Sequence, residues 1–117
     1  MSGGGEALPK GTGSRRFLFL QGPLSPLYCL MGAHLWHAGH RVHRINFCAG
    51  DWLHWHGEGC VSYRGTTDAW TGYVSAFMDR RSITDIVLHA DQRIYHKVAV
   101  AEAQKRGIRV FVTELGL

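Results

Sequence analysis

Short apolar runs of strand length alternate with segments of helical periodicity along most of the chain, and this alternation limits the possible folds most strongly. The runs 17–20 and 86–88 are continuous and apolar, which is typical of strands buried on both faces of a sheet. Further strands are predicted at 41–48, 60–63 and 108–112. Strands that alternate with helices form parallel sheets through right-handed crossovers. We therefore predict an α/β fold, a Rossmann-like three-layer domain with a mostly parallel sheet.

Two of the expected helices have clear starting residues. The first begins at Ser25 or Pro26 and ends at Ala38, before Gly39. The second begins at Asp68, the predicted N-cap. Its apolar residues recur at the spacing of one buried helical face: Trp70, Tyr73, Val74, Phe77 and Met78. We expect this face to pack against the sheet.

A third helix is predicted from Ile94 to Arg106. Its periodicity rests on Ile94, Val98 and Ala101, and Gly107 is expected to end it. The basic residue Arg106 suits the negative end of the helix dipole. This helix completes the alternation that a Rossmann-like domain requires.

Length and composition indicate one domain. A chain of 117 residues with 45% hydrophobic and 19% charged residues is typical of a globular protein, which excludes disordered and coiled-coil classes. Residues 1–15 are rich in glycine and are expected to form a flexible leader, whereas residues 16–117 form the domain. Neither a secretory signal nor a membrane span is predicted, so we expect a cytoplasmic location. No helical pattern follows the last strand, so the domain is expected to be truncated before a second domain.

Three cysteines and eight histidines raise the question of a metal site. Cys29, Cys48 and Cys60 form an odd set without C-x-x-C spacing, so we expect buried free thiols. His34 and His37 lie three residues apart on the first helix without a carboxylate partner. We therefore expect no metal and no cofactor.

Charged residues after the fourth predicted strand are the main catalytic candidates, because ligands of open α/β sheets bind beyond the carboxyl ends of the strands. Asp91 could act as a base, Arg93 could clamp a phosphate or carboxylate, and His96 could transfer protons. Glu114 follows the last strand and could face the same cleft. The alternatives are a helix N-cap for Asp91 and a solvated turn residue for Glu114.

The other strand ends carry weaker signals. Segment 21–25 contains one glycine rather than G-x-G-x-x-G, and the chain has no G-x-x-x-x-G-K-[ST], which disfavours a dinucleotide or P-loop site. Three aromatic residues near Asp51 could stack on a sugar face or pack in an aromatic core: Trp52, Trp55 and Tyr63. The net charge of +4 suits an anionic partner. No nucleic-acid-binding motif accompanies that charge, so no nucleic-acid partner is expected.

Several short motifs, in chain order, carry a resemblance to a known family. They are FLQGPLSP at 19–26, GHRVHRINF at 39–47, GDW at 50–52, DQRIYH at 91–96, and GIRVFV at 107–112 followed by ELG at 114–116. Together they resemble the N-terminal part of capsule polysaccharide biosynthesis and export proteins. That family includes the Kdo transferases that build the glycolipid linker of bacterial capsules. The resemblance spans about residues 16–117 and coincides with the predicted strand ends.

The resemblance implies one half of a GT-B-like glycosyltransferase with two Rossmann-like domains. Such an enzyme uses CMP-β-Kdo to extend a poly-Kdo linker on a phosphatidylglycerol-type lipid acceptor. Its CMP site lies mainly in the second domain, so the 117-residue chain alone is expected to be inactive. In related enzymes the glutamate that matches Glu114 is functionally important. We accordingly expect the catalytic residues to be Glu114, Asp91 and His96. The expected substrate-binding residues are Arg93, Asp51, Gly22, Ser25 and Trp52.

The resemblance also implies partners and a location for the full-length protein. The partners are the CMP-Kdo donor, the lipid-linked saccharide acceptor and a capsule assembly or export complex, at the inner face of the cytoplasmic membrane. The alternative is a non-catalytic Rossmann-like module whose basic surface binds an anionic ligand or a capsule-assembly partner. An uncovered last strand also makes a homo-oligomer of the chain an expectation.

Overall fold

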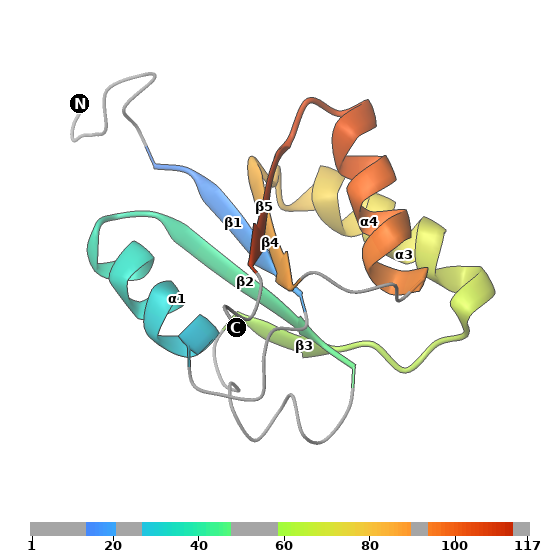
Figure 1. The fold of residues 1–117 in the computed structure, drawn as a ribbon, viewed down its shortest axis with the longest axis horizontal. Coiled ribbons are helices and arrows are strands. Elements are labelled where there is room, and N and C mark those ends of the chain that lie inside the picture. The colour runs from blue at the N-terminus through green and yellow to red at the C-terminus, as the bar shows by residue number, and fades with distance from the viewer. Residues whose placement is uncertain (1–13, 21–26, 48–58, 90–93, 114–117) are drawn as a thin grey trace.

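Five strands in the described part of the chain form one parallel sheet. The computed structural model describes residues 14–20, 27–47, 59–89 and 94–113. The strands are β1 (Arg16–Phe19), β2 (Arg41–Asn46), β3 (Cys60–Ser62), β4 (Asp85–His89) and β5 (Arg109–Thr113). They lie in the order β3-β2-β1-β4-β5, and every neighbouring pair is parallel (Figure 1). The strand order reverses between β1 and β4, as in doubly wound sheets, so the predicted α/β Rossmann-like fold is confirmed.

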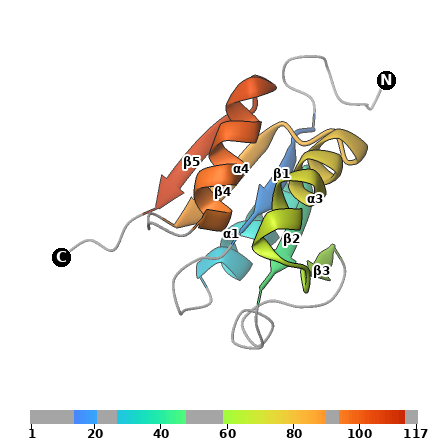
Figure 2. The same ribbon diagram turned by 90° about the vertical axis from the view of Figure 1, so that its right-hand side faces the viewer.

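The described helices lie on both faces of the sheet. α1 (Leu27–His37) covers one face, and α3 (Thr67–Arg80) and α4 (Ile94–Lys105) lie side by side on the other (Figures 1 and 2). Successive side chains of a strand point to opposite faces. In β1, Leu18 accordingly packs toward α3 and α4, whereas Phe19 packs toward α1. The three layers follow directly from this alternation.

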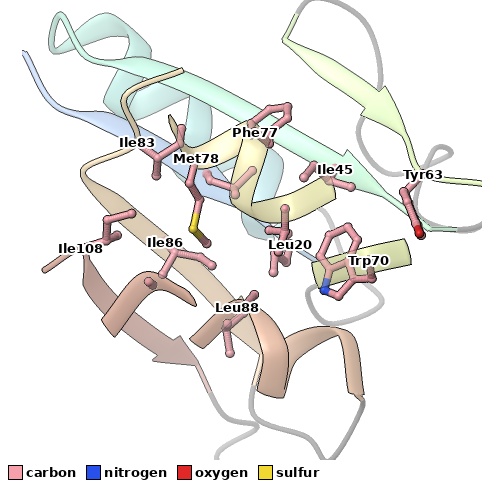
Figure 3. Packing of buried hydrophobic residues seen from close by; sticks show 14 residues of the cluster. Leu20, Ile45, Tyr63, Trp70, Phe77, Met78, Ile83, Ile86, Leu88 and Ile108 are labelled. Atoms are coloured by element: carbon pink, nitrogen blue, oxygen red, sulfur yellow. The ribbon is translucent and has the colours of Figure 1, made fainter. Parts of the chain in front are cut away.

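The larger apolar cluster lies between the sheet and the helices α3 and α4 (Figure 3). Trp70 is fully buried there, and its Nε1 donates a hydrogen bond to the carbonyl of Tyr95 at 2.9 Å. The ring centroids of Tyr63 and Phe47 lie 4.9 and 5.1 Å from that of Trp70. Tyr63 is therefore a core residue, so of the two expectations for its side chain, packing in an aromatic core is confirmed rather than stacking on a sugar.

The opposite face combines a smaller apolar cluster with buried polar groups. The cluster consists of Phe17, Phe19, Tyr28 and Val87. Beside it, Arg44 is 4% exposed. Its Nε donates to Oδ1 of Asn46 at 2.6 Å, and its Nη1 donates to the carbonyl of Leu20 at 2.9 Å. A buried guanidinium is costly unless its donors are satisfied, and these bonds tie the ends of β1 and β2 together.

A buried carboxylate fixes the amino edge of the sheet. Asp85 is fully buried, and its Oδ1 accepts from Nε of Arg15 and from Oγ1 of Thr84, each at 2.6 Å. Its Oδ2 accepts from Nε of Arg109 at 2.8 Å. The backbone N–H of Arg15 also donates to Nδ1 of His40 at 2.9 Å. Arg15 therefore belongs to the fold rather than to the predicted leader, and residues 1–13 lie outside the described residues.

The N-cap of α3 is Thr66, so the prediction of Asp68 was wrong. Thr66 has an extended backbone, and its Oγ1 accepts a hydrogen bond from the N–H of Ala69 at 3.1 Å. Asp68 lies in the first turn, where its charge is favourable beside the positive end of the helix dipole. The buried face is confirmed, because it consists of Trp70, Val74, Phe77 and Met78.

The third predicted helix is present as α4, and of its three predicted apolar positions Val98 alone packs against the larger cluster. Gly39 and Gly107, the expected stops, have the positive φ angles of 94° and 70° typical of C′ residues. However, Ile94 is 49% exposed and Ala101 is also exposed. The buried residues of α4 are His96, Ala99, Glu102 and Ala103. Small alanine side chains let α4 pack closely, and the two polar residues are buried because hydrogen bonds hold them.

Candidate functional site

The carboxyl edge of the sheet is where the sequence predicts a site. All the strands are parallel, so they end at this common edge. Seven predicted residues lie in segments that follow the strands in sequence and fall outside the described residues: Gly22, Ser25, Asp51, Trp52, Asp91, Arg93 and Glu114. Their roles remain predictions. The eighth, His96, is described, and it adjoins a polar cluster at the same edge.

This cluster, which we call the strand-end relay, consists of Tyr28, Thr113 and His89. The hydroxyl of Tyr28 lies 2.7 Å from Oγ1 of Thr113, and that oxygen lies 3.1 Å from Nδ1 of His89. The relay therefore links the first turn of α1 to the last residues of β4 and β5. It joins segments that are up to 85 residues apart in the chain.

The fold positions each member of the relay. His89 and Thr113 are the last residues of their strands and are direct partners in the β4–β5 register. Both therefore present side chains to the same face of the sheet, the face that α1 covers. Tyr28 is 3% exposed, and its ring packs edge-to-face on Phe19 with centroids 5.2 Å apart. Apolar packing thus aims the phenol hydroxyl at the end of β5.

The relay contains two hydroxyls and an imidazole, each of which can donate or accept a hydrogen bond. Either oxygen of the Tyr28–Thr113 pair can be the donor, and the role of the His89 nitrogen follows from its tautomer. When a proton enters at one end of the relay, reversing all the bonds releases a proton at the other end. Such an arrangement can orient a bound hydroxyl or phosphate, or give it a proton while another is taken up at the opposite end.

His96 supports the relay from the other face of the sheet. It is 2% exposed, and its Nδ1 lies 3.0 Å from the carbonyl oxygen of His89. A carbonyl oxygen only accepts, so Nδ1 of His96 carries the proton of this bond. The bond ties the first turn of α4 to the last residue of β4. The sequence predicts proton transfer by His96, but its burial and this bond fit a positioning residue better.

Sequence reasoning searched the segments that contain His89 and Thr113 without selecting either residue, and it missed Tyr28. Tyr28 stands in an apolar helix, where its hydroxyl is hidden among core residues. One signal was available, because the last residue of each parallel strand and the first turn of the following helix meet at one edge. Applying that rule to every polar residue, rather than to charged ones, selects the relay.

Within the described residues no group of three or more possible ligands could hold a metal, and no helix is long and apolar enough to cross a membrane. Cys29 and Cys60 are free, as expected, but they are half-buried rather than buried. Partial burial raises the pKa of Cys60 to about 11, so its thiol stays protonated near neutral pH. His34 and His37 are exposed on α1. Cys48 lies outside the described residues.

Comparisons with known proteins support the fold. No family model matches the chain, and no curated protein matches it. Among solved structures, the Bordetella bronchiseptica enzyme WbmH in complex with NAD+ has a similar fold, with a TM-score of 0.57 and 16% sequence identity. The match covers 80% of this chain but 37% of that chain, so this chain spans little more than a third of its solved neighbour. The chain is a Rossmann-like α/β module with a polar relay at its carboxyl edge.

Proposed function

We propose that this chain is the acceptor-side Rossmann-like lobe of a capsule polysaccharide glycosyltransferase. In its full-length form the enzyme would add Kdo from CMP-Kdo to a lipid-linked capsule linker. A second lobe would bind most of the CMP-Kdo donor, and the cleft between the lobes would hold the acceptor sugar. The chain alone would then bind acceptor without transferring sugar.

One observation carries the proposal. Four of the motifs extend into a segment that follows a strand in sequence: 19–26, 50–52, 91–96 and 114–116. All the described strands end at one edge of the sheet. The strand-end relay lies at that same edge. The strands that precede these motifs thus all end at the edge where ligands of such sheets bind, which supports a shared site rather than separate structural turns.

In the proposed mechanism, carboxylates act on the reacting groups, and a cationic side chain binds the anionic group of the sugar. Glu114 or Asp91 would take the proton of the attacking acceptor hydroxyl or stabilise the positive charge that develops on the donor sugar. Arg93 would hold a sugar carboxylate or phosphate. The relay would orient the acceptor, and His96 would fix the end of β4 that carries it.

Because its proposed acceptor is a lipid, the full-length enzyme would act at the inner face of the cytoplasmic membrane. The chain carries a net charge of +4, which favours contact with anionic lipid headgroups. We therefore include peripheral membrane association, and contact with a capsule assembly or export complex, in the proposal.

A transfer assay on the full-length protein, at the length at which its source cell produces it, tests the proposal. We expect transfer from CMP-Kdo to a lipid-linked acceptor, and we expect Glu114→Gln and Asp91→Asn to remove it while the protein stays folded. Asp79→Asn is the matched control, because Asp79 is an exposed carboxylate in the last turn of α3. Wild-type rates in both site variants would refute the site assignment, and no transfer by the wild-type protein would refute the activity.

The alternative is a non-catalytic module that binds a nucleotide or another anion, and the fold shared with an NAD+-bound enzyme favours it. Dinucleotide sites of this fold need G-x-G-x-x-G and an acidic residue about 20 residues further on. Residues 41–47 contain no acidic residue, and β2 ends at Asn46, whose Oδ1 already accepts from Arg44. Saturable NAD+ binding by this chain would favour the alternative over the transferase lobe.

A further inference from the structure

A cavity of about 500 Å³ lies at the outer edge of β2, away from the strand-end relay. Four elements contribute to its wall: α1, β2, the start of β3 and the end of α3. Strand β3 pairs only with the second half of β2, from Arg44 to Asn46. Residues 41–43 are therefore left without a β3 partner, and the cavity occupies this open part of the sheet.

A glycine shapes one end of the cavity. Gly59 has a φ of +83°, and a Cβ at this position would lie 2.7 Å from the carbonyl oxygen of Val42. Its own carbonyl accepts from the N–H of Arg44 at 2.8 Å. Only glycine allows the chain to enter β3 this close to β2. The wall of the cavity is thus built by backbone geometry and not by a chance gap between side chains.

The floor of the cavity is largely apolar. Small residues of α1, Gly32 and Ala33, leave the space open, and Val61 and Phe77 line it from β3 and α3. Trp36, which is 51% exposed, lines the cavity from α1, on the other face of the sheet from Phe77. Such a surface accepts an alkyl or aryl group.

The charges on the cavity wall are all positive. Arg41 and Arg81 line it together with His43, and no described lining residue is acidic. Burial lowers the pKa of His43, and the nearby Arg81 and Arg41 lower it further, which reports a positive potential in the cavity. Neither arginine forms an ion pair within the part of the chain that the structure describes.

The two arginines keep donors available for a ligand. The guanidinium of Arg81 lies over the ring of Phe77, 5.6 Å from its centroid. A guanidinium stacked in this way retains its in-plane N–H groups for a phosphate. Arg41, at the start of β2, is exposed and can approach the same ligand.

We propose that this cavity binds a phosphate ester with an apolar substituent, with Arg41 and Arg81 holding the phosphate and the apolar group lying beside Phe77 and Val61. The ester is either a membrane phospholipid headgroup or a soluble alkyl or aryl phosphate. The site is separate from the strand-end relay and does not depend on the proposed transfer reaction.

Calorimetric titration of the chain with octyl phosphate tests this site. We expect one saturable site, with inorganic phosphate and octyl glucoside each binding at least about tenfold more weakly, because each lacks one of the two recognised parts. Arg41→Gln and Arg81→Gln should each weaken octyl phosphate binding by about tenfold, the usual scale of a charge-assisted hydrogen bond. Arg80→Gln is the matched control, since Arg80 is the exposed neighbour of Arg81 and is not among the lining residues.

Two results would overturn the proposal: unchanged octyl phosphate binding by the Arg41→Gln/Arg81→Gln double variant, or equal affinity for octyl glucoside. Both arginines are exposed, so these variants should fold, which thermal unfolding checks. Sedimentation with phosphatidylcholine vesicles containing phosphatidylglycerol then distinguishes a membrane phospholipid from a soluble phosphate ester as the ligand. Co-sedimentation that the double variant loses identifies a membrane phospholipid, whereas octyl phosphate binding without co-sedimentation identifies a soluble phosphate ester.

Discussion

The two faces of the sheet are held in different ways. On the face covered by α3 and α4, 14 buried residues form one apolar cluster around Trp70 (Figure 3). On the face covered by α1, the apolar cluster has four residues, and buried polar groups share the space with it. Those groups are Asp85 at the amino edge and Arg44 and Asn46 nearer the carboxyl edge.

This difference between the two faces indicates that one contributes mainly to stability and the other mainly to the candidate site. Burial of apolar area is non-directional, and it dominates on the α3–α4 face, where the buried polar side chains are His96 and Glu102 of α4. The α1 face instead places polar atoms at defined positions, and it ends at the strand-end relay of Tyr28, Thr113 and His89. We therefore expect substitutions on the α3–α4 face to change stability most, and those on the α1 face to change site geometry at a smaller cost in stability.

The largest effect should come from Trp70→Ala. It removes a fully buried indole and its hydrogen bond to Tyr95, and should lower the free energy of unfolding by about 3–5 kcal/mol. Trp36→Ala is the control on α1, where the side chain is 51% exposed, and it should cost less than about 1 kcal/mol. Urea unfolding of both variants measures the difference. Equal losses would mean that the α3–α4 cluster is not the main source of stability.

Asp85→Asn should have the next largest effect, of about 2 kcal/mol, because it weakens three hydrogen bonds at a buried position and removes a charge between two arginines. The expected loss in the free energy of unfolding is modest because Arg15 and Arg109 are partly exposed and can be hydrated. Asp79→Asn, which removes an exposed partner of Arg106, should cost much less. If the two substitutions cost the same in urea unfolding, the amino edge is not held by its buried carboxylate.

Glu102→Gln should give a smaller loss that depends on pH. Hydrogen bonds from Ser75, Lys105 and Arg106 lower the pKa of Glu102 to about 2. A carboxylate whose folded pKa is depressed stabilises the fold above its unfolded pKa, and loses that contribution as the pH falls toward the folded value. The difference in melting temperature between wild type and variant should therefore be full at pH 7 and shrink below about pH 4.5. A difference that stays constant between pH 7 and pH 3 would contradict this origin.

The sequence predicted the helices and strands better than it predicted which face of each helix is buried. It predicted the hydrogen bonds of buried polar residues least well. The period of α3 identified its buried side, because its apolar residues are large and packing against the sheet is their only favourable environment. In α4 the same reasoning was wrong, since Ile94 is exposed while Glu102 is buried by specific hydrogen bonds. Polar burial depends on partners far away in the chain, such as Ser75 for Glu102. Local periodicity contains no information on such pairs.

The same limit applies to the candidate site. Parallel strands allow the edge to be predicted, and four segments with candidate residues follow strands that end there. The same rule selects the residues of the relay but not its hydrogen bonds, because Tyr28 and Thr113 are 85 residues apart and meet only through the strand order. His96 was selected for its chemistry, but its depth below the surface follows from how α4 packs.

Tyr28→Phe should have the smallest effect on stability and the clearest effect on the relay. The ring keeps its contact with Phe19, so the loss is that of one hydrogen bond, about 0.5–1 kcal/mol. Removing the phenol hydroxyl takes away one of the hydrogen-bond partners of Thr113 and should shift the imidazole nitrogen resonances of His89 in an NMR spectrum. Tyr73→Phe is the control, because Tyr73 packs beside Trp70 on the other face of the sheet. A His89 spectrum that responds equally to both substitutions would mean that the three side chains do not act as one relay, and the α1 face would then differ from its opposite only in composition.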